Sequence, residues 1–184
     1  MINKEVHLDE LLMVETAKYQ VIQKDGDFEI RKYEKILLAT VRNVPSRFGV
    51  LFNYISGSNK SRKKVAMTSP VITSEEIAMT SPVLSSNDSM SFVVPSEYTR
   101  ETVPVPTDER VVINEVPERY VATVRFSGVA GENSIKKQSD RLLHWLKAEN
   151  IESNGLPFLM RYNPPYVPSF LRRNELGIEV KYKD

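Results

Sequence analysis

The stretch LLATVR (Leu37–Arg42) returns eighty-three positions later as YVATVR (Tyr120–Arg125). Both copies are largely apolar and contain β-branched residues, which is typical of a buried strand. Each copy leads into a segment with helical spacing, residues 47–55 after the first and residues 132–150 after the second. The chain therefore repeats a strand-to-helix unit, which predicts two related halves.

Shorter patterns predict further strands around these two units. Asp25-Gly26 predicts a hairpin between residues 19–22 and 28–31, because glycine adopts the positive φ that such a turn requires. The run VAMTSPV (65–71) recurs as IAMTSPV (77–83), and each copy ends in Ser-Pro. Such an ending suits the end or the edge of a strand, because proline cannot donate to a ladder. The other predicted strands cover residues 91–95, 110–116, 156–162 and 177–181.

These elements predict an α+β domain with pseudo-twofold symmetry. Each half has strands around one helix, and no flexible linker separates the halves, so we expect them to share one core. We expect the halves to cover about residues 19–100 and 101–182, after an N-terminal extension over residues 1–18.

Composition excludes several classes of function. The 184 residues include 25 Lys and Arg against 24 Asp and Glu, a formal net charge of +1. This balance argues against a dedicated nucleic-acid binder, which carries a basic excess. The sequence has no cysteine, which excludes disulfides, thiolate metal sites and cysteine nucleophiles.

No run reaches the roughly 20 apolar residues of a membrane span, and the first residues lack the pattern of a secretory signal. We expect a cytoplasmic protein.

Few residues have the setting of a catalytic or metal-binding group. The sequence has two histidines, His7 and His144. We interpret His144 as a solvated side chain, because it falls opposite the apolar stripe of the second helix, which contains Ile135, Leu142 and Leu146. Serine-nucleophile motifs and glycine-rich phosphate loops are absent from the sequence. We therefore expect a binding protein with no catalytic residues and no metal ligands, rather than an enzyme.

The first helix carries more apolar surface than one sheet can cover. Its apolar side chains span an arc of about 200°, whereas one sheet contact needs roughly 100°. The core stripe is expected from the spacing of Val44, Phe48, Leu51 and Ile55, widened by Phe52 on one side and by Val50 and Tyr54 on the other.

Two interpretations of this excess stay open. Either the N-terminal segment or a loop covers it, or a flat apolar ligand does. Arg47 lies at one end of the helix, and a basic loop with Lys63 and Lys64 follows the other end. These side chains are placed to hold the anionic groups of such a ligand.

The least generic stretch is RYNPPYVPSFLRRNEL (161–176). Its three prolines predict an extended excursion from the sheet, and the Arg-Arg-Asn-Glu run leads the chain back. Two interpretations of Arg172 stay open. It either hydrogen-bonds the carbonyls of this excursion and buttresses it, or joins Tyr166 in contacting a ligand.

The same stretch resembles the signature of the SOUL/haem-binding-protein family, in which a Tyr-Asp/Asn-Pro-Pro segment precedes Arg-Arg-Asn-Glu. Other stretches agree with the family and come in its order: FEIRKYE (28–34), YISGSN (54–59), the two AMTSPV copies and MSFVVP (90–95). The resemblance covers about residues 19–181. It implies an α+β fold, a pseudo-twofold symmetric, distorted antiparallel β-barrel with one main helix in each half, similar to GyrI-like small-molecule-binding modules.

The resemblance also implies that haem or another tetrapyrrole binds against the first helix. Phe48 and Phe52 align with the apolar positions that face haem in the family. Some members have an axial histidine in the first half, whereas no histidine lies between His7 and His144 here. Pro45 and Val167 stand where some members have an arginine and a lysine. The implied groove consists of Arg47, Phe48, Leu51, Phe52, Ile55, Lys63, Lys64, Tyr166 and Arg172.

A second hypothesis keeps the fold and changes the ligand. In this hypothesis the chain is a GyrI-like binding module, or an enzyme, that uses the same groove for another amphipathic small molecule. The identity of a co-purifying ligand discriminates between the two hypotheses.

Overall fold

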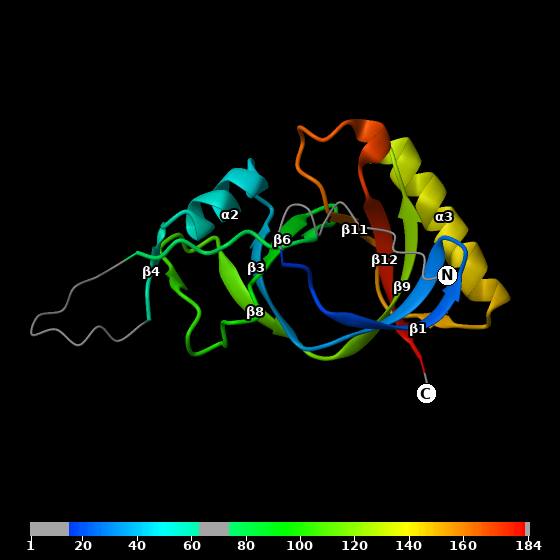
Figure 1. Cartoon of the computed structure of the whole chain (residues 1–184), viewed down its shortest axis with the longest axis horizontal. Helices are drawn as coiled ribbons and strands as arrows, with labels where there is room; N and C mark the ends of the chain where they lie inside the picture. The colour runs from blue at the N-terminus through cyan, green and yellow to red at the C-terminus, as the bar shows by residue number, and fades with distance from the viewer. Residues whose placement is uncertain (1–14, 63–73, 183–184) are drawn as a thin grey trace, which may run out of the picture.

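The computed structural model describes residues 15–62 and 74–182, and Figure 1 shows how their elements are arranged. The elements before residue 100 are β1 (Tyr19–Asp25), β2 (Phe28–Tyr33), β3 (Ile36–Arg42), α2 (Arg47–Ile55), β4 (Asn59–Lys60), β5 (Val83–Ser85) and β6 (Ser89–Val93). Those after it are β7 (Val105–Pro106), β8 (Val112–Val116), β9 (Arg119–Phe126), α3 (Glu132–Ala148), β10 (Glu152–Ser153), β11 (Phe158–Arg161), the 3-10 turn η1 (Ser169–Leu171) and β12 (Asn174–Lys181).

The hairpin, both helices and both repeated strands are confirmed. β1 and β2 pair around Asp25 and Gly26, and Gly26 has the positive φ of 55° that the turn was expected to need. The strand expected to begin at Val65, and with it the first AMTSPV copy, lies outside the described residues. Of the second copy only Val83 belongs to a strand.

One antiparallel sheet of ten strands connects the whole domain. Its order is β1-β2-β9-β12-β11-β5-β6-β3-β8, and β10 pairs with β12. The order is symmetric about its middle, where β11 pairs with β5. On either side of this pair, β12 corresponds to β6, and both are the last long strands of their halves. Next to them, β9 corresponds to β3, and each of these strands leads into a helix. This order confirms the pseudo-twofold α+β architecture. It also shows that one strand from each half pairs with the other half, since β2 adds to β9 and β8 adds to β3.

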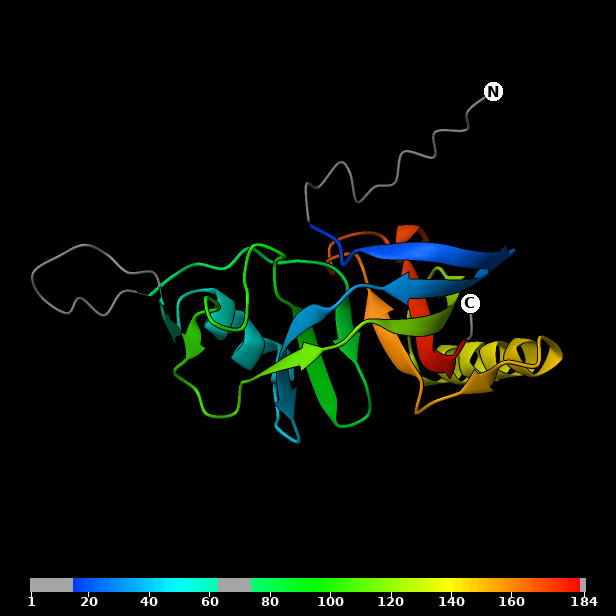
Figure 2. The same ribbon diagram turned by 90° about the horizontal axis from the view of Figure 1, so that it is seen from below.

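The sheet curls strongly, and each helix covers the strands at one end of it (Figures 1 and 2). One core cluster lies under α2 and is made by β3, β6 and the segments near residues 77 and 103; a second lies under α3 and is made by β2, β9, β11 and β12. A third cluster fills the inner face between them, with Ala17, Tyr33, Leu38, Val93 and Val121. The expected single core is therefore three neighbouring clusters on one continuous sheet.

The chain itself closes the inner face of the sheet. Residues 15–17 lie beside Ser81, where the amide of Ala17 donates to the Ser81 carbonyl (2.9 Å) and the amide of Ser81 donates to the Glu15 carbonyl (2.8 Å). The pocket that Tyr33, Val121 and Met160 line on this face leaves about 10 Å³. That volume is about what a single water molecule needs.

The two helices meet the sheet through stripes that agree with the sequence pattern to different degrees. On α3 the expected stripe is confirmed, because Leu142 and Leu146 are buried and Ile135 packs partly buried against the same core cluster. On α2 the buried residues are Val50, Leu51, Tyr54 and Ile55, whereas Phe48 is 45% exposed. The place of Phe48 in the core stripe was therefore wrong. The helix is turned so that Tyr54 and Leu51 face the sheet, which leaves the side with Phe48 uncovered. No helix in the described part of the chain has the length and apolar character needed to cross a membrane.

Candidate functional site

Two phenylalanines of α2 form an exposed aromatic platform on the outside of the domain. Phe48 and Phe52 are 45% and 47% exposed, and their rings stack with centroids 6.0 Å apart and planes at 14°. The i, i+4 spacing on a helix places the two rings on one face. Phe48 also contacts the buried ring of Phe92 edge-on at 5.4 Å. We call the Phe48–Phe52 pair the α2 platform.

Other residues of the expected groove lie under the platform rather than on it. Leu51 is fully buried and Ile55 is buried as well, both in the core cluster beneath α2. They hold the helix against the sheet, and their side chains are not accessible to a ligand outside it. The wide apolar arc predicted for this helix therefore has two parts. One part packs in the core under α2, and the other part, the α2 platform, remains exposed.

Arg47 lies in the first turn of α2 and reaches the β5–β6 turn. Its guanidinium donates to the carbonyl of Asn87 at 3.0 Å, and the side chain stays exposed. The described residues contain no carboxylate paired with it. Its positive charge is therefore available next to the platform. Lys63 and Lys64, the other predicted cations, lie outside the described residues.

The proline-rich excursion, residues 163–172, is held by Arg172. The Arg172 Nε donates to the Val167 carbonyl at 2.7 Å, and a terminal nitrogen donates to the Pro165 carbonyl. Val167 is buried, so it anchors the loop, while Tyr166 beside it is 78% exposed. The buttress interpretation of Arg172 is confirmed. Both ribbon views show the tip of this loop on the side of the first turn of α2 (Figures 1 and 2).

The Arg-Arg-Asn-Glu run also completes a buried charge network. Glu175 is fully buried, and its carboxylate accepts hydrogen bonds from Arg31 (3.0 Å to Oε1), Tyr162 (2.8 Å) and Arg173 (2.8 Å). Asn174 donates to the Gly128 carbonyl at 3.0 Å. Arg31 lies within the FEIRKYE motif and Glu175 within the Arg-Arg-Asn-Glu run, but no local signal connects positions 144 residues apart.

Electrostatics fix the protonation state of this network. Burial by itself raises the pKa of Glu175, but hydrogen bonds and charge from Arg31, with the charge of Arg173, hold it at about 2. Burial also raises the pKa of Tyr162 well above its usual value. The carboxylate is therefore charged and fully partnered, and the neighbouring phenol is neutral. Such a group stabilises structure and has no free lone pair for a substrate.

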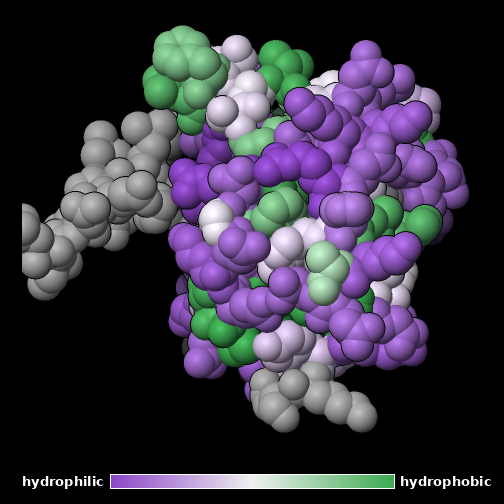
Figure 3. Space-filling view, turned by 90° about the vertical axis from the view of Figure 1, so that its right-hand side faces the viewer, coloured by the Kyte–Doolittle hydropathy of each residue, from purple (hydrophilic) through white to green (hydrophobic). Residues whose placement is uncertain are grey.

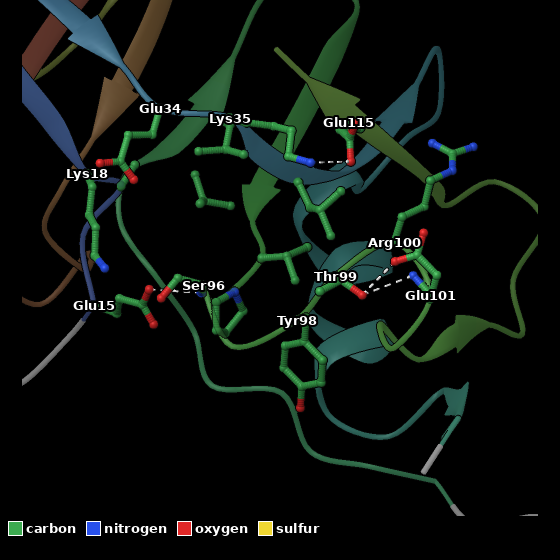
Figure 4. Close-up of a pocket in the computed structure, with 16 residues that line it drawn as sticks. Glu15, Lys18, Glu34, Lys35, Ser96, Tyr98, Thr99, Arg100, Glu101 and Glu115 are labelled. Atoms are coloured by element: carbon green, nitrogen blue, oxygen red, sulfur yellow. Dashed lines mark hydrogen bonds and ion pairs between the residues drawn. The ribbon is translucent and has the colours of Figure 1, made fainter. Parts of the chain in front are cut away.

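A cavity of about 510 Å³ opens beside β3 and the segment after β6 (Figure 4). Its walls carry both signs of charge, and several groups pair with each other. Lys35 lies 3.4 Å from Glu115, and Glu15 accepts the amide of Ser96 at 2.9 Å. The charged lining residues are Glu15, Lys18, Glu34, Lys35, Arg100, Glu101 and Glu115. This mixture does not favour one sign of ligand.

The described residues do not form a metal centre. They contain no group of three His, Cys, Asp or Glu side chains close enough to hold an ion. His144 lies on the exposed face of α3, as expected, and His7 lies outside the described residues.

Comparison with known proteins agrees with the motifs. The model of the family described as SOUL heme-binding protein matches residues 14–179. The chain is 31% identical over 163 residues to a protein named Heme-binding protein 1 from Xenopus laevis, and 30% identical to its namesake from Xenopus tropicalis; each match covers 84% of both chains.

Two solved structures resemble the fold at low sequence identity. A hydrolase from Listeria innocua matches with a TM-score of 0.58 and 10% identity, over 95% of this chain and 97% of that one. The C-terminal domain of EcmrR matches with a TM-score of 0.55 and 11% identity, over 89% and 98%. At this identity the likeness concerns the fold alone.

Proposed function

Because the chain belongs to the SOUL heme-binding protein family, we propose that it binds haem or a related tetrapyrrole on the α2 platform. The observation that carries this proposal is the pair of stacked, half-exposed rings of Phe48 and Phe52. The two rings are half exposed and lie nearly parallel on one face of α2. Flat aromatic ligands stack on such surfaces.

The surroundings of the platform suit a tetrapyrrole with carboxylate groups. The Arg47 guanidinium is exposed in the adjoining turn of α2, and an arginine can form charge-assisted hydrogen bonds with a propionate. Tyr166 is 78% exposed on the proline-rich loop. It could contact the edge of a bound ring. Lys63 and Lys64 remain candidates for a second carboxylate.

The inner face of the sheet is a poorer site for the same ligand. The pocket among Tyr33, Val121 and Met160 on this face holds about 10 Å³, far below the roughly 300 to 1,000 Å³ of small-molecule pockets. A ligand on the outside avoids the displacement of residues 15–17 and Ser81 from that face.

Affinity on the platform can come from apolar contact without an iron ligand from histidine. Burial of about 300 Å² of apolar surface at about 25 cal/mol per Å² contributes about 7 kcal/mol, before the cost of association. Bound haem supplies its own redox and ligand chemistry. The proposed role of this chain is to hold it by stacking and by charge.

A haemin titration followed by the Soret band tests the proposal. Phe48→Ala combined with Phe52→Ala should weaken binding about tenfold or more, because it removes the stacking surface. His144→Ala and Leu156→Ala, both on exposed side chains away from α2, serve as matched controls and should bind as the parent does. Loss of the Soret change in His144→Ala, with the phenylalanine variant unaffected, would contradict the proposal.

A further inference from the structure

A second cavity lies at the far side of the proline-rich loop, where β9, α3 and η1 meet. It encloses about 450 Å³ and is lined by Asp27, Arg125, Phe126, Ser127, Arg141, Phe170, Leu171, Arg172 and Arg173. Four of these residues are arginines, and one is an acid. None of them belongs to α2, so this arginine pocket is separate from the α2 platform.

The charge of the arginine pocket is only partly neutralised. Arg173 is paired with Glu175, at 2.8 Å. Arg125 is exposed, and its guanidinium has no ion-pair partner within the described part of the chain. Arg141 lies 3.3 Å from Asp27, but both side chains are solvent-exposed, and such surface pairs contribute little. Arg172 binds carbonyls and keeps its full charge. The lining therefore carries the charges of Arg125, Arg141 and Arg172 against that of Asp27, and this net positive charge suits an anionic ligand.

The wall of the pocket next to these arginines is apolar and rigid. Phe170 and Leu171 are 72% and 55% exposed. They sit on η1, where the Leu171 amide donates to the Pro168 carbonyl (2.9 Å) and the Gly128 amide donates to the Ser169 carbonyl (3.0 Å). The face of the domain on the side of α3 is otherwise largely hydrophilic, with hydrophobic side chains projecting at its upper edge (Figure 3). Large contiguous apolar patches mark binding sites, and Phe170 and Leu171 form the exposed apolar part of this pocket's lining.

We propose that the arginine pocket binds a phosphate monoester carried by an apolar group, with the phosphate at Arg125 and Arg141 and the apolar group on Phe170 and Leu171. A phosphate monoester carries close to two negative charges at neutral pH, and arginine binds its oxygens in a bidentate manner. A cationic pocket with an apolar rim recognises both parts of such a molecule. The proposal does not depend on haem binding.

Calorimetric titration with dodecyl phosphate, below its micelle concentration, tests the pocket. Arg125→Gln and Arg141→Gln should each weaken binding about tenfold, the usual effect of losing one charge-assisted hydrogen bond. Arg42→Gln is the matched control, because Arg42 is an exposed arginine near Asp88 on another part of the sheet. Phe170→Ser with Leu171→Ser should weaken dodecyl phosphate about fivefold or more and leave inorganic phosphate unchanged.

Vesicles containing phosphatidate distinguish the source of the phosphate. Binding of dodecyl phosphate together with vesicle binding, both weakened by Arg125→Gln, supports a lipid headgroup. Binding of dodecyl phosphate without vesicle binding supports a soluble phosphate ester. The proposal is overturned if dodecyl phosphate does not bind, or if Arg42→Gln weakens it as much as Arg125→Gln does. Phe48→Ala with Phe52→Ala should retain dodecyl phosphate binding, so failure of the haem proposal leaves this result intact.

Discussion

Glu175 is the buried acid on which Arg31, Tyr162 and Arg173 converge. Its pKa of about 2 in the folded protein lies below the usual 4.5, so its contribution is present above pH 4.5 and is lost as the pH falls toward 2. Glu175→Gln leaves Arg31 and Arg173 without their buried counter-charge and should lower the free energy of unfolding by about 3 kcal/mol at pH 7. Urea unfolding from pH 7 to pH 2.5 should show this deficit shrinking with acidification. An equal deficit at both ends of the range would contradict the assignment.

At the scale of an element, the proline-rich loop owes its shape to one guanidinium as well as to its prolines. Arg172→Ala removes both hydrogen bonds to the loop carbonyls. Amide hydrogen exchange of residues 166–171 should then accelerate about tenfold, the effect of losing about 1.4 kcal/mol locally. Global unfolding should change little, because the loop lies outside the core clusters. Arg110→Ala, in the exposed turn with Asp108, is the control. Unchanged exchange in Arg172→Ala would mean that the prolines alone hold the loop.

At the scale of the whole molecule, the exchanged strands couple the two helix-covered cores. Leu51→Ala creates a cavity under α2 and should cost about 2–4 kcal/mol. Trp145 lies in the other core, stacked on Phe28 at 5.1 Å. Because β2 and β8 each belong to the sheet of the opposite half, its fluorescence should report the same lowered midpoint as far-UV circular dichroism. Leu156→Ala, on an exposed side chain, should leave both probes unchanged. A Trp145 transition unaffected by Leu51→Ala would show that the cores unfold separately.

Short sequence patterns correctly predicted the features that depend on neighbouring residues, namely a turn, a strand and the buried side of a helix. The Asp25-Gly26 turn, the strand at residues 36–41 and the stripe of α3 follow from short-range spacing and turn chemistry. Helical spacing wrongly placed Phe48 in the core stripe of α2, because the side of a helix that faces a sheet depends on packing and not on spacing alone. The family motifs supplied the pseudo-twofold barrel, which periodicity could only suggest. The division of the chain near residue 100 stays a prediction.

The candidate sites were predictable to a lesser degree, for a physical reason. Phe48 and Phe52 are neighbours on one helix, so their pairing follows from spacing. The contact between Arg31 and Glu175 joins residues 144 positions apart, and the arginine pocket collects side chains from three separate elements. Such convergence exists only after the chain has folded, and one sequence contains no spacing that encodes it.

The outward position of the α2 platform has a kinetic consequence. A flat molecule resting on Phe48 and Phe52 keeps its opposite face in water, because the rings lie on the surface and not within the barrel. Its arrival and departure require no opening of the sheet, so the lifetime of the complex depends on the surface contacts, the stacking on the two rings and the charge of Arg47. Rapid exchange of this kind favours passing a ligand from one carrier to the next over storing it.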